Sequence, residues 1–115
     1  MNGNRLKWTD MNWATYLGCS VQQVQEYKQI LNEHFIPLIK RDNKTKKYSF
    51  EMYRYDTTGR KKPHLEISDK RQFNNIAEAT DNANSLISCM ELKESWANNF
   101  NMPKRAIQMM LIREK

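Results

Sequence analysis

A short pattern of side chains occurs twice in this chain of 115 residues, at a constant offset of 83 residues. In each copy a Trp-Ala pair is followed, four residues after the Ala, by a Gly or Asn, which favour a left-handed turn. Ser or Pro, suited to begin a helix, comes next, and a branched apolar residue lies within that helix. The matching residues are Trp13, Ala14, Gly18, Ser20 and Val24 in the first copy and Trp96, Ala97, Asn101, Pro103 and Ile107 in the second. The spacing predicts two helical hairpins, because the small Ala lets two helices touch.

Helical periodicity predicts the first hairpin in more detail. Thr9 and Ser20 are suitable N-caps for helices over about 10–17 and 21–33. Gly18 ends the first of these helices. We expect the inward face of the second helix to consist of Val24, Tyr27, Ile30 and Leu31.

The middle of the chain has the alternation of β-strands. The predicted strands cover residues 36–40, 47–55 and 63–67, with turns at 42–45 and 56–59. Pro37 lacks an N–H group, which places the first strand at a sheet edge. The apolar faces contain Tyr48, Phe50 and Met52 on the second strand, and Leu65 and Ile67 on the third. Tyr53 and Tyr55 fall on the opposite face, where aromatic rings between cations can stack bases of a single strand. We instead expect helices to cover them. The pattern predicts a three-stranded antiparallel meander.

The C-terminal part is predicted to be helical from about residue 75. Its apolar stripe consists of Ile76, Ala79, Ala83, Leu86, Ile87 and Met90, at steps of three and four. We expect this helix to continue, or to kink near Glu91, as far as Phe100. Asn101 ends it, and Pro103 begins a last helix with Ile107, Met110 and Leu111 facing inward. The chain is thus expected to be a single α+β domain, with a helical hairpin over 10–33, a basic sheet over 36–68 and helices over 75–113.

The composition fits one folded domain. Apolar residues make up 39% of the chain and the mean hydropathy is −0.89, so a polar surface surrounds a modest core. No apolar run approaches the roughly 20 residues of a membrane span, and residues 1–5 lack the apolar core of a signal peptide. Cys19 and Cys89 lack a metal-ligand spacing. We therefore expect both to be reduced and mostly buried in a cytoplasmic protein.

Positive charge is concentrated in the middle third of the chain. Residues 36–71 carry eleven basic and five acidic residues, and their net charge of +6 equals that of the whole chain. Such asymmetry favours a polyanionic partner. The alternative is that the cations keep exposed hairpins soluble and protect the sheet edges. The same two interpretations apply to the tip of the second predicted hairpin, which contains Arg60, Lys61 and Lys62.

Residues 10–50 resemble the helix-turn-helix family of DNA-binding domains, and more closely its winged, excisionase-like members. Residues 13–20 are similar to that family's first helix and turn, residues 21–31 to its recognition helix and residues 36–48 to its basic wing. The resemblance implies contacts with the bases of double-stranded DNA from Val21, Gln22, Gln25, Glu26 and Gln29. It implies phosphate contacts from Lys40, Arg41, Lys44, Lys46 and Lys47.

The predicted last helix offers a second kind of contact. Its outward face is expected to contain Lys104, Arg105, Gln108, Met109 and Ile112. Lys104 and Arg105 suit phosphate contacts, whereas Met109 and Ile112 suit a protein partner or a homodimer. An ordinary core helix is the alternative.

The favoured function is a small DNA-binding protein that acts as a homodimer, either as a transcriptional regulator or as an architectural or recombination accessory factor. The alternative is a protein-interaction module of a phage or mobile element, which acts through the Met-rich C-terminal helix. We expect no enzyme, cofactor or metal. His34 and His64 lie 30 residues apart without ligand neighbours, and the chain has no Gly-rich phosphate loop. Glu51 and Glu66 are expected to form ion pairs with nearby cations.

Overall fold

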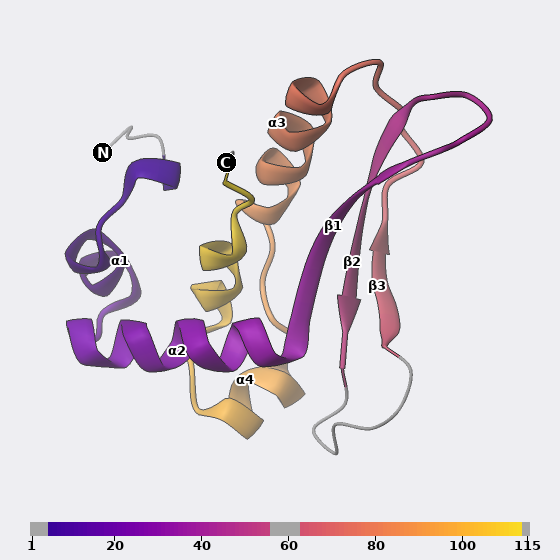
Figure 1. The fold of residues 1–115 in the computed structure, drawn as a ribbon. Helices are drawn as coiled ribbons and strands as arrows, with labels where there is room; N and C mark the ends of the chain where they lie inside the picture. The colour runs from indigo at the N-terminus through magenta and orange to yellow at the C-terminus, as the bar shows by residue number, and fades with distance from the viewer. Residues whose placement is uncertain (1–4, 56–62, 114–115) are drawn as a thin grey trace.

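The helices of the chain gather on one side of a three-stranded sheet (Figure 1). The computed structural model describes residues 5–55 and 63–113. The helices are η1 (Arg5–Lys7), α1 (Asp10–Leu17), α2 (Val21–His34), α3 (Ile76–Ile87), α4 (Glu94–Phe100) and the 3-10 helix η2 (Lys104–Met110). The strands are β1 (Phe35–Arg41), β2 (Tyr48–Arg54) and β3 (His64–Ser68). The predicted α+β fold and its order of elements are thereby confirmed.

The repeated pattern forms two hairpins with the same turn. Gly18 and Asn101 both adopt the left-handed conformation, with φ of 73° and 51°. Each turn is closed by two backbone N–H groups that donate to the Ala of the Trp-Ala pair: Gly18 and Cys19 donate to Ala14, and Asn101 and Met102 donate to Ala97. The two hairpins predicted from the 83-residue offset are therefore present, down to the bonds of the turn.

The second hairpin differs from the first because its second helix is buried. η2 packs against α1, α2 and α3, and Gln108 is only 4% exposed. The prediction that Gln108 faces outward is thus wrong. Its side-chain oxygen accepts from Arg5 (2.7 Å) and from the Tyr16 hydroxyl (2.9 Å), and its nitrogen donates to the Met90 carbonyl (3.0 Å). Both the oxygen and the nitrogen of this buried amide therefore have hydrogen-bond partners, as is usual for buried polar groups. η2 thereby supports the α1–α2 hairpin from within the core.

The sheet is an antiparallel meander in the order β1-β2-β3, so Pro37 lies on an edge strand as predicted. Phe50 and Met52 are buried beneath α3, as their alternation indicated. An irregularity in the β2–β3 pairing falls between Met52 and Tyr53, which pair with Ile67 and Leu65. Leu65 therefore turns away from the core and is 51% exposed. The predicted common face of Leu65 and Ile67 is wrong for this reason.

Three further expectations need correction. Helices cover only one face of the sheet in Figure 1, so Tyr53 is half-buried and its hydroxyl donates to Glu51 (2.8 Å) rather than lying beneath a helix. The chain between α3 and α4 is not helical, because the N–H of Leu92 bonds to the carbonyl of Lys104 instead. Cys89 is exposed, while Cys19 is half-buried at the first turn. Of the helices described, none is both long and apolar enough to cross a membrane.

Candidate nucleic-acid interface

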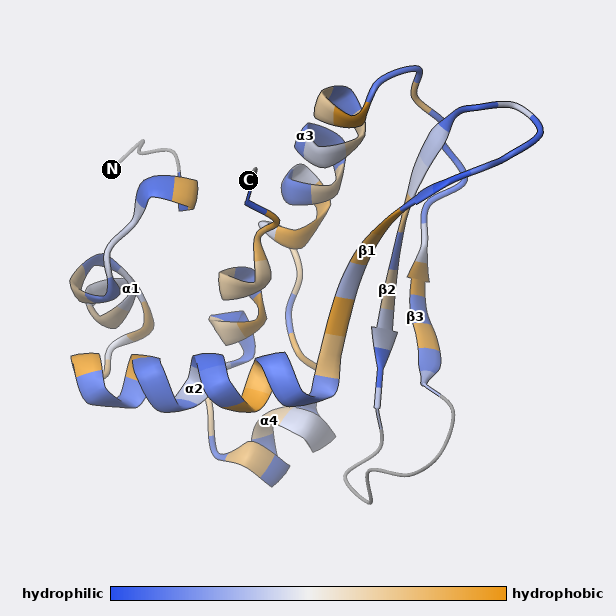
Figure 2. Cartoon of the chain, in the orientation of Figure 1, coloured by the Kyte–Doolittle hydropathy of each residue, from blue (hydrophilic) through white to orange (hydrophobic). Residues whose placement is uncertain are grey.

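The tip of the β1–β2 hairpin is a tight polar loop that presents cations to solvent. Asp42 shapes the loop, because its carboxylate accepts from the N–H of Lys44 (2.8 Å) and its own N–H donates to the Lys47 carbonyl (2.9 Å). Lys46 completes the turn with a φ of 61°. Figure 2 shows the tip as a continuous hydrophilic segment, in contrast to the apolar stretch of β1 that leads to it. All five predicted wing residues are exposed: Lys40, Arg41, Lys44, Lys46 and Lys47.

The connection from β3 to α3 brings two more cations to this end of the sheet. The N–H of Asp69 bonds to the Phe50 carbonyl (3.0 Å), and Tyr48 and Phe73 exchange two backbone hydrogen bonds of 2.8 Å. The connection therefore runs beside β2 towards the hairpin tip and carries Lys70 and Arg71 with it. Neither residue was predicted as a contact. Their contribution to the charge of residues 36–71 was visible in the sequence, but their position depends on this pairing.

We call this set the basic end of the sheet: Lys40, Arg41, Lys44, Lys46, Lys47, Lys70 and Arg71. Lys40 lies 3.1 Å from Glu51, which raises the pKa of Lys40, and Arg71 lies 3.5 Å from Asp69. Burial alone would raise the pKa of Asp69, but hydrogen bonds from Asn82 and Arg71 lower it. Within residues 5–55 and 63–113, the other five cations form no ion pair: Arg41, Lys44, Lys46, Lys47 and Lys70. Exposed cations without carboxylate partners are the groups that bind phosphate.

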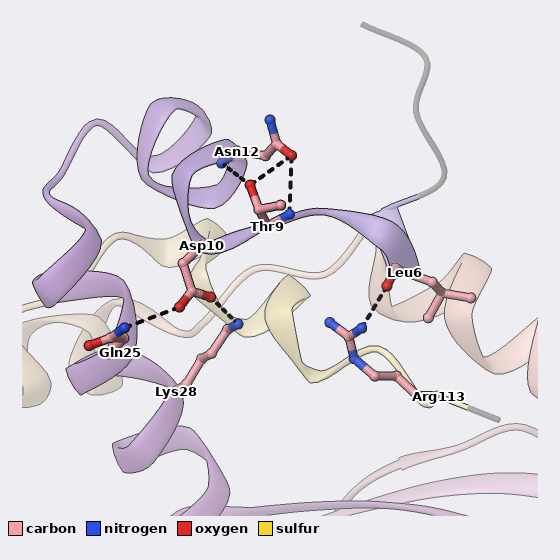
Figure 3. A network of polar contacts seen from close by, with 7 residues as sticks. All are labelled: Leu6, Thr9, Asp10, Asn12, Gln25, Lys28 and Arg113. Atoms are coloured by element: carbon pink, nitrogen blue, oxygen red, sulfur yellow. Dashed lines mark hydrogen bonds and ion pairs between the residues drawn. The ribbon is translucent and has the colours of Figure 1, made fainter. Parts of the chain in front are cut away.

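The outward face of α2 is polar and carries acidic groups. All five predicted base-contacting residues are exposed there: Val21, Gln22, Gln25, Glu26 and Gln29. Asp10, from the first turn of α1, accepts from Lys28 (2.6 Å) and from the Gln25 amide (3.4 Å), as Figure 3 shows. The hydrogen bond from Lys28 lowers the pKa of Asp10. Lys28 thus already has a carboxylate partner, and α2 offers amides for hydrogen bonding rather than unpaired cations.

The two predicted contact sets do not form one surface. The hairpin tip lies at the far end of β1 from α2, and β1 turns away from the line of the helix (Figure 1). The first residue of α2 is separated from the tip by the 14-residue helix and the 7-residue strand. Those elements are about 21 Å and about 23 Å long. A single duplex would therefore have to extend across the molecule to meet both.

The remaining candidates lie elsewhere. Lys104 and Arg105 are exposed at the start of η2, and the Arg105 guanidinium lies 4.6 Å from the centre of the Tyr16 ring. Met109 and Ile112 are half-buried and line a groove beside α2. The predicted contacts Arg60, Lys61 and Lys62 lie outside the described residues.

Glu51, Glu66 and His34 make structural contacts. Glu51 pairs with Lys40, and Glu66 pairs with Arg54 and lies 3.7 Å from Lys93, as expected for these carboxylates. The His34 ring packs 4.9 Å from the Phe100 ring, measured between centroids. In the part of the chain that the structure describes, no group of three or more His, Cys, Asp or Glu is placed to hold a metal ion.

Comparisons with protein-family models, with curated proteins and with solved structures found no match. The resemblance to the helix-turn-helix family therefore stays a prediction from the residues. A functional proposal has to be based on the geometry of the chain itself.

Proposed function

We propose that this chain binds double-stranded DNA and holds the phosphate backbone with the basic end of its sheet. The observation that supports this most is the set of five exposed cations there that lack an ion pair among the described residues. Each lysine or arginine that meets a phosphate releases a condensed counterion, so several of them together give binding that depends steeply on salt. The hydrogen bonds around Asp42 favour this role, because they define the backbone of the turn that carries the cations.

The α1–α2 hairpin is proposed to add contacts with the bases. Gln22, Gln25 and Gln29 present amide groups of the kind that pair with adenine in the major groove. Because α2 and the basic end are far apart, we propose that they meet a duplex at separate positions along it. In a homodimer two α2 helices would contact half-sites about one helical turn apart. The protein would then serve as a transcriptional regulator or as an architectural or recombination accessory factor of a phage or mobile element, without enzymatic activity.

A titration of a labelled random-sequence duplex, followed by fluorescence anisotropy at several salt concentrations, tests this function. We expect micromolar or tighter binding at low salt, with a steep loss of affinity as salt increases. The absence of binding at low salt, where attraction between opposite charges is strongest, would refute the proposal.

A further inference from the structure

A groove lies between the end of α2, the start of β1, the end of η2 and the residues that follow η2. Its volume is about 490 Å³, within the range of about 300–1,000 Å³ that is usual for ligand clefts. Eight of its eleven lining residues are apolar, from Leu31, residues 35–37 and residues 109–112. It is separate from the basic end of the sheet, because none of the seven cations of that end lines it.

Both charged residues in the lining are cations. Lys28 and Arg113 lie there with Asn32, and among the described residues that line the groove none has a carboxylate side chain. Lys28 donates to Asp10 (2.6 Å), and Arg113 donates to the Leu6 carbonyl (2.7 Å), as Figure 3 shows. An ammonium has three N–H donors and a guanidinium five, so both side chains keep donors for an incoming anion. Asp10 offsets one of these two charges, so the described margin of the groove keeps a net positive charge. The groove therefore complements a group that is apolar on one side and acidic at its margins.

The edge of β1 restricts the shape of the occupant. The N–H of Tyr55 bonds to the His34 carbonyl, and the N–H of Asp42 bonds to the Lys47 carbonyl. In an antiparallel pair, the residues that bond to the neighbouring strand alternate with residues that do not. The backbone N–H and C=O groups of residues 36, 38 and 40 therefore point towards β2, and those of residues 35, 37 and 39 point away from the sheet. One of these is Pro37, which has no N–H to offer. An added strand would lose a hydrogen bond at that point, whereas a helix that inserts side chains would not.

We propose that this groove binds an acidic amphipathic helix from a partner protein. Leucine-sized side chains of that helix would fill the apolar floor, and carboxylates beside them would meet Lys28 and Arg113. Met109 and Met110 suit this role, because unbranched methionine side chains adapt to the shape of an incoming surface. This inference is independent of DNA binding, since it uses a different surface and different residues.

The test uses two labelled synthetic helical peptides of about 14 residues, with identical leucine positions at helical spacing. One peptide carries glutamate and the other lysine at the flanking positions. Each is titrated with the wild-type chain, with the double variant Lys28→Gln and Arg113→Gln, and with the control Lys44→Gln and Lys46→Gln, by fluorescence anisotropy. The two double variants lose the same charge, but only the first loses it at the groove. Amide NMR spectra of the wild-type chain locate the bound peptide.

We expect the glutamate peptide to bind and to shift the amides of residues 109–112. The groove variant should weaken this binding about tenfold, because two partly exposed charge pairs are lost, while the control should leave it unchanged. Equal binding of the lysine peptide, equal weakening by both variants or no binding at all would overturn the proposal. Displacement of the peptide by decanoate at equal concentration would also overturn the proposal, because it would indicate that the groove binds an acyl chain. A dimer that light scattering detects and that the groove variant separates would overturn it as well, because the occupant would then be a second copy of this chain.

Discussion

The salt dependence of DNA binding gives the most quantitative test of the basic end of the sheet. Five of its cations form no ion pair among the described residues: Arg41, Lys44, Lys46, Lys47 and Lys70. At about 0.9 per neutralised phosphate, five contacts give a log–log slope of about −4.5. Affinity should then fall about 500-fold between about 50 and about 200 mM salt.

Changing Lys44, Lys46 and Lys47 to Gln leaves two of these contacts, so the slope should become about −1.8 and the loss over the same range about twelvefold. Glutamine keeps most of the side chain's length, and these positions are exposed, so thermal unfolding should be unchanged. The matched control changes Lys7, Lys93 and Arg113 to Gln, because these residues are also exposed, lie away from the basic end and are assigned to no phosphate contact. An equal change of slope in both triple variants, measured by anisotropy, would refute the placement of the phosphate contacts.

Three further predictions concern stability, measured by urea denaturation. Gly18→Ala should cost about 1 kcal/mol, because the left-handed φ of 73° is strained for alanine although nothing lies within 4 Å of the added Cβ. Asn101→Gly should be neutral or stabilising, because glycine adopts the left-handed conformation of Asn101 without strain. If Asn101→Gly cost as much as Gly18→Ala, the two turns would not share this conformational requirement. Asp10→Asn should cost about 0.5–1 kcal/mol at pH 7, since it breaks a partly exposed pair. The pKa of Asp10 is lowered from 3.8, so the carboxylate stabilises the folded state above that pH, and this stabilisation is lost as the pH falls below it. The free energies of unfolding of the variant and the wild type should therefore converge near pH 2. A difference that persists there would contradict a stabilising role of the ionised carboxylate. Ile107→Ala should cost about 2–5 kcal/mol, because the side chain is 2% exposed, and a cost below about 1 kcal/mol would indicate that η2 is not part of the core.

The boundaries of α1 and the start of α2 were predictable because the signals that set them are local. The Thr9 hydroxyl accepts from the N–H of Asn12, and Ser20 does the same for Gln23, so each cap depends on residues within one turn. Gly18 ends α1 for an equally local reason. Strand alternation likewise identified Phe50 and Met52 as buried side chains of β2.

The burial of η2 was not predictable from local signals. Gln108 looked like a surface residue, and it is buried because Arg5, 103 residues away in sequence, donates to its amide oxygen. The outward turn of Leu65 results from an irregular pairing with β2, which periodicity along a single strand does not reveal.

The candidate interface likewise contains residues that were predictable from local sequence and residues that were not. The wing cations were predictable from composition and turn residues, whereas Lys70 and Arg71 join them only through the pairing of Tyr48 with Phe73. The pairing of Lys28 on α2 with a carboxylate was not predictable either, because Asp10 belongs to α1 and reaches Lys28 across the hairpin.

The most direct test of the DNA-binding surface is an amide NMR titration of the wild-type chain with a short random-sequence duplex at low salt. We expect the largest shifts at residues 40–47 and 70–71, with smaller shifts on α2 where Gln22 and Gln25 approach bases. The absence of shifts, or shifts confined to surfaces away from residues 40–47 and 70–71, would contradict the proposal that the basic end of the sheet holds the DNA backbone.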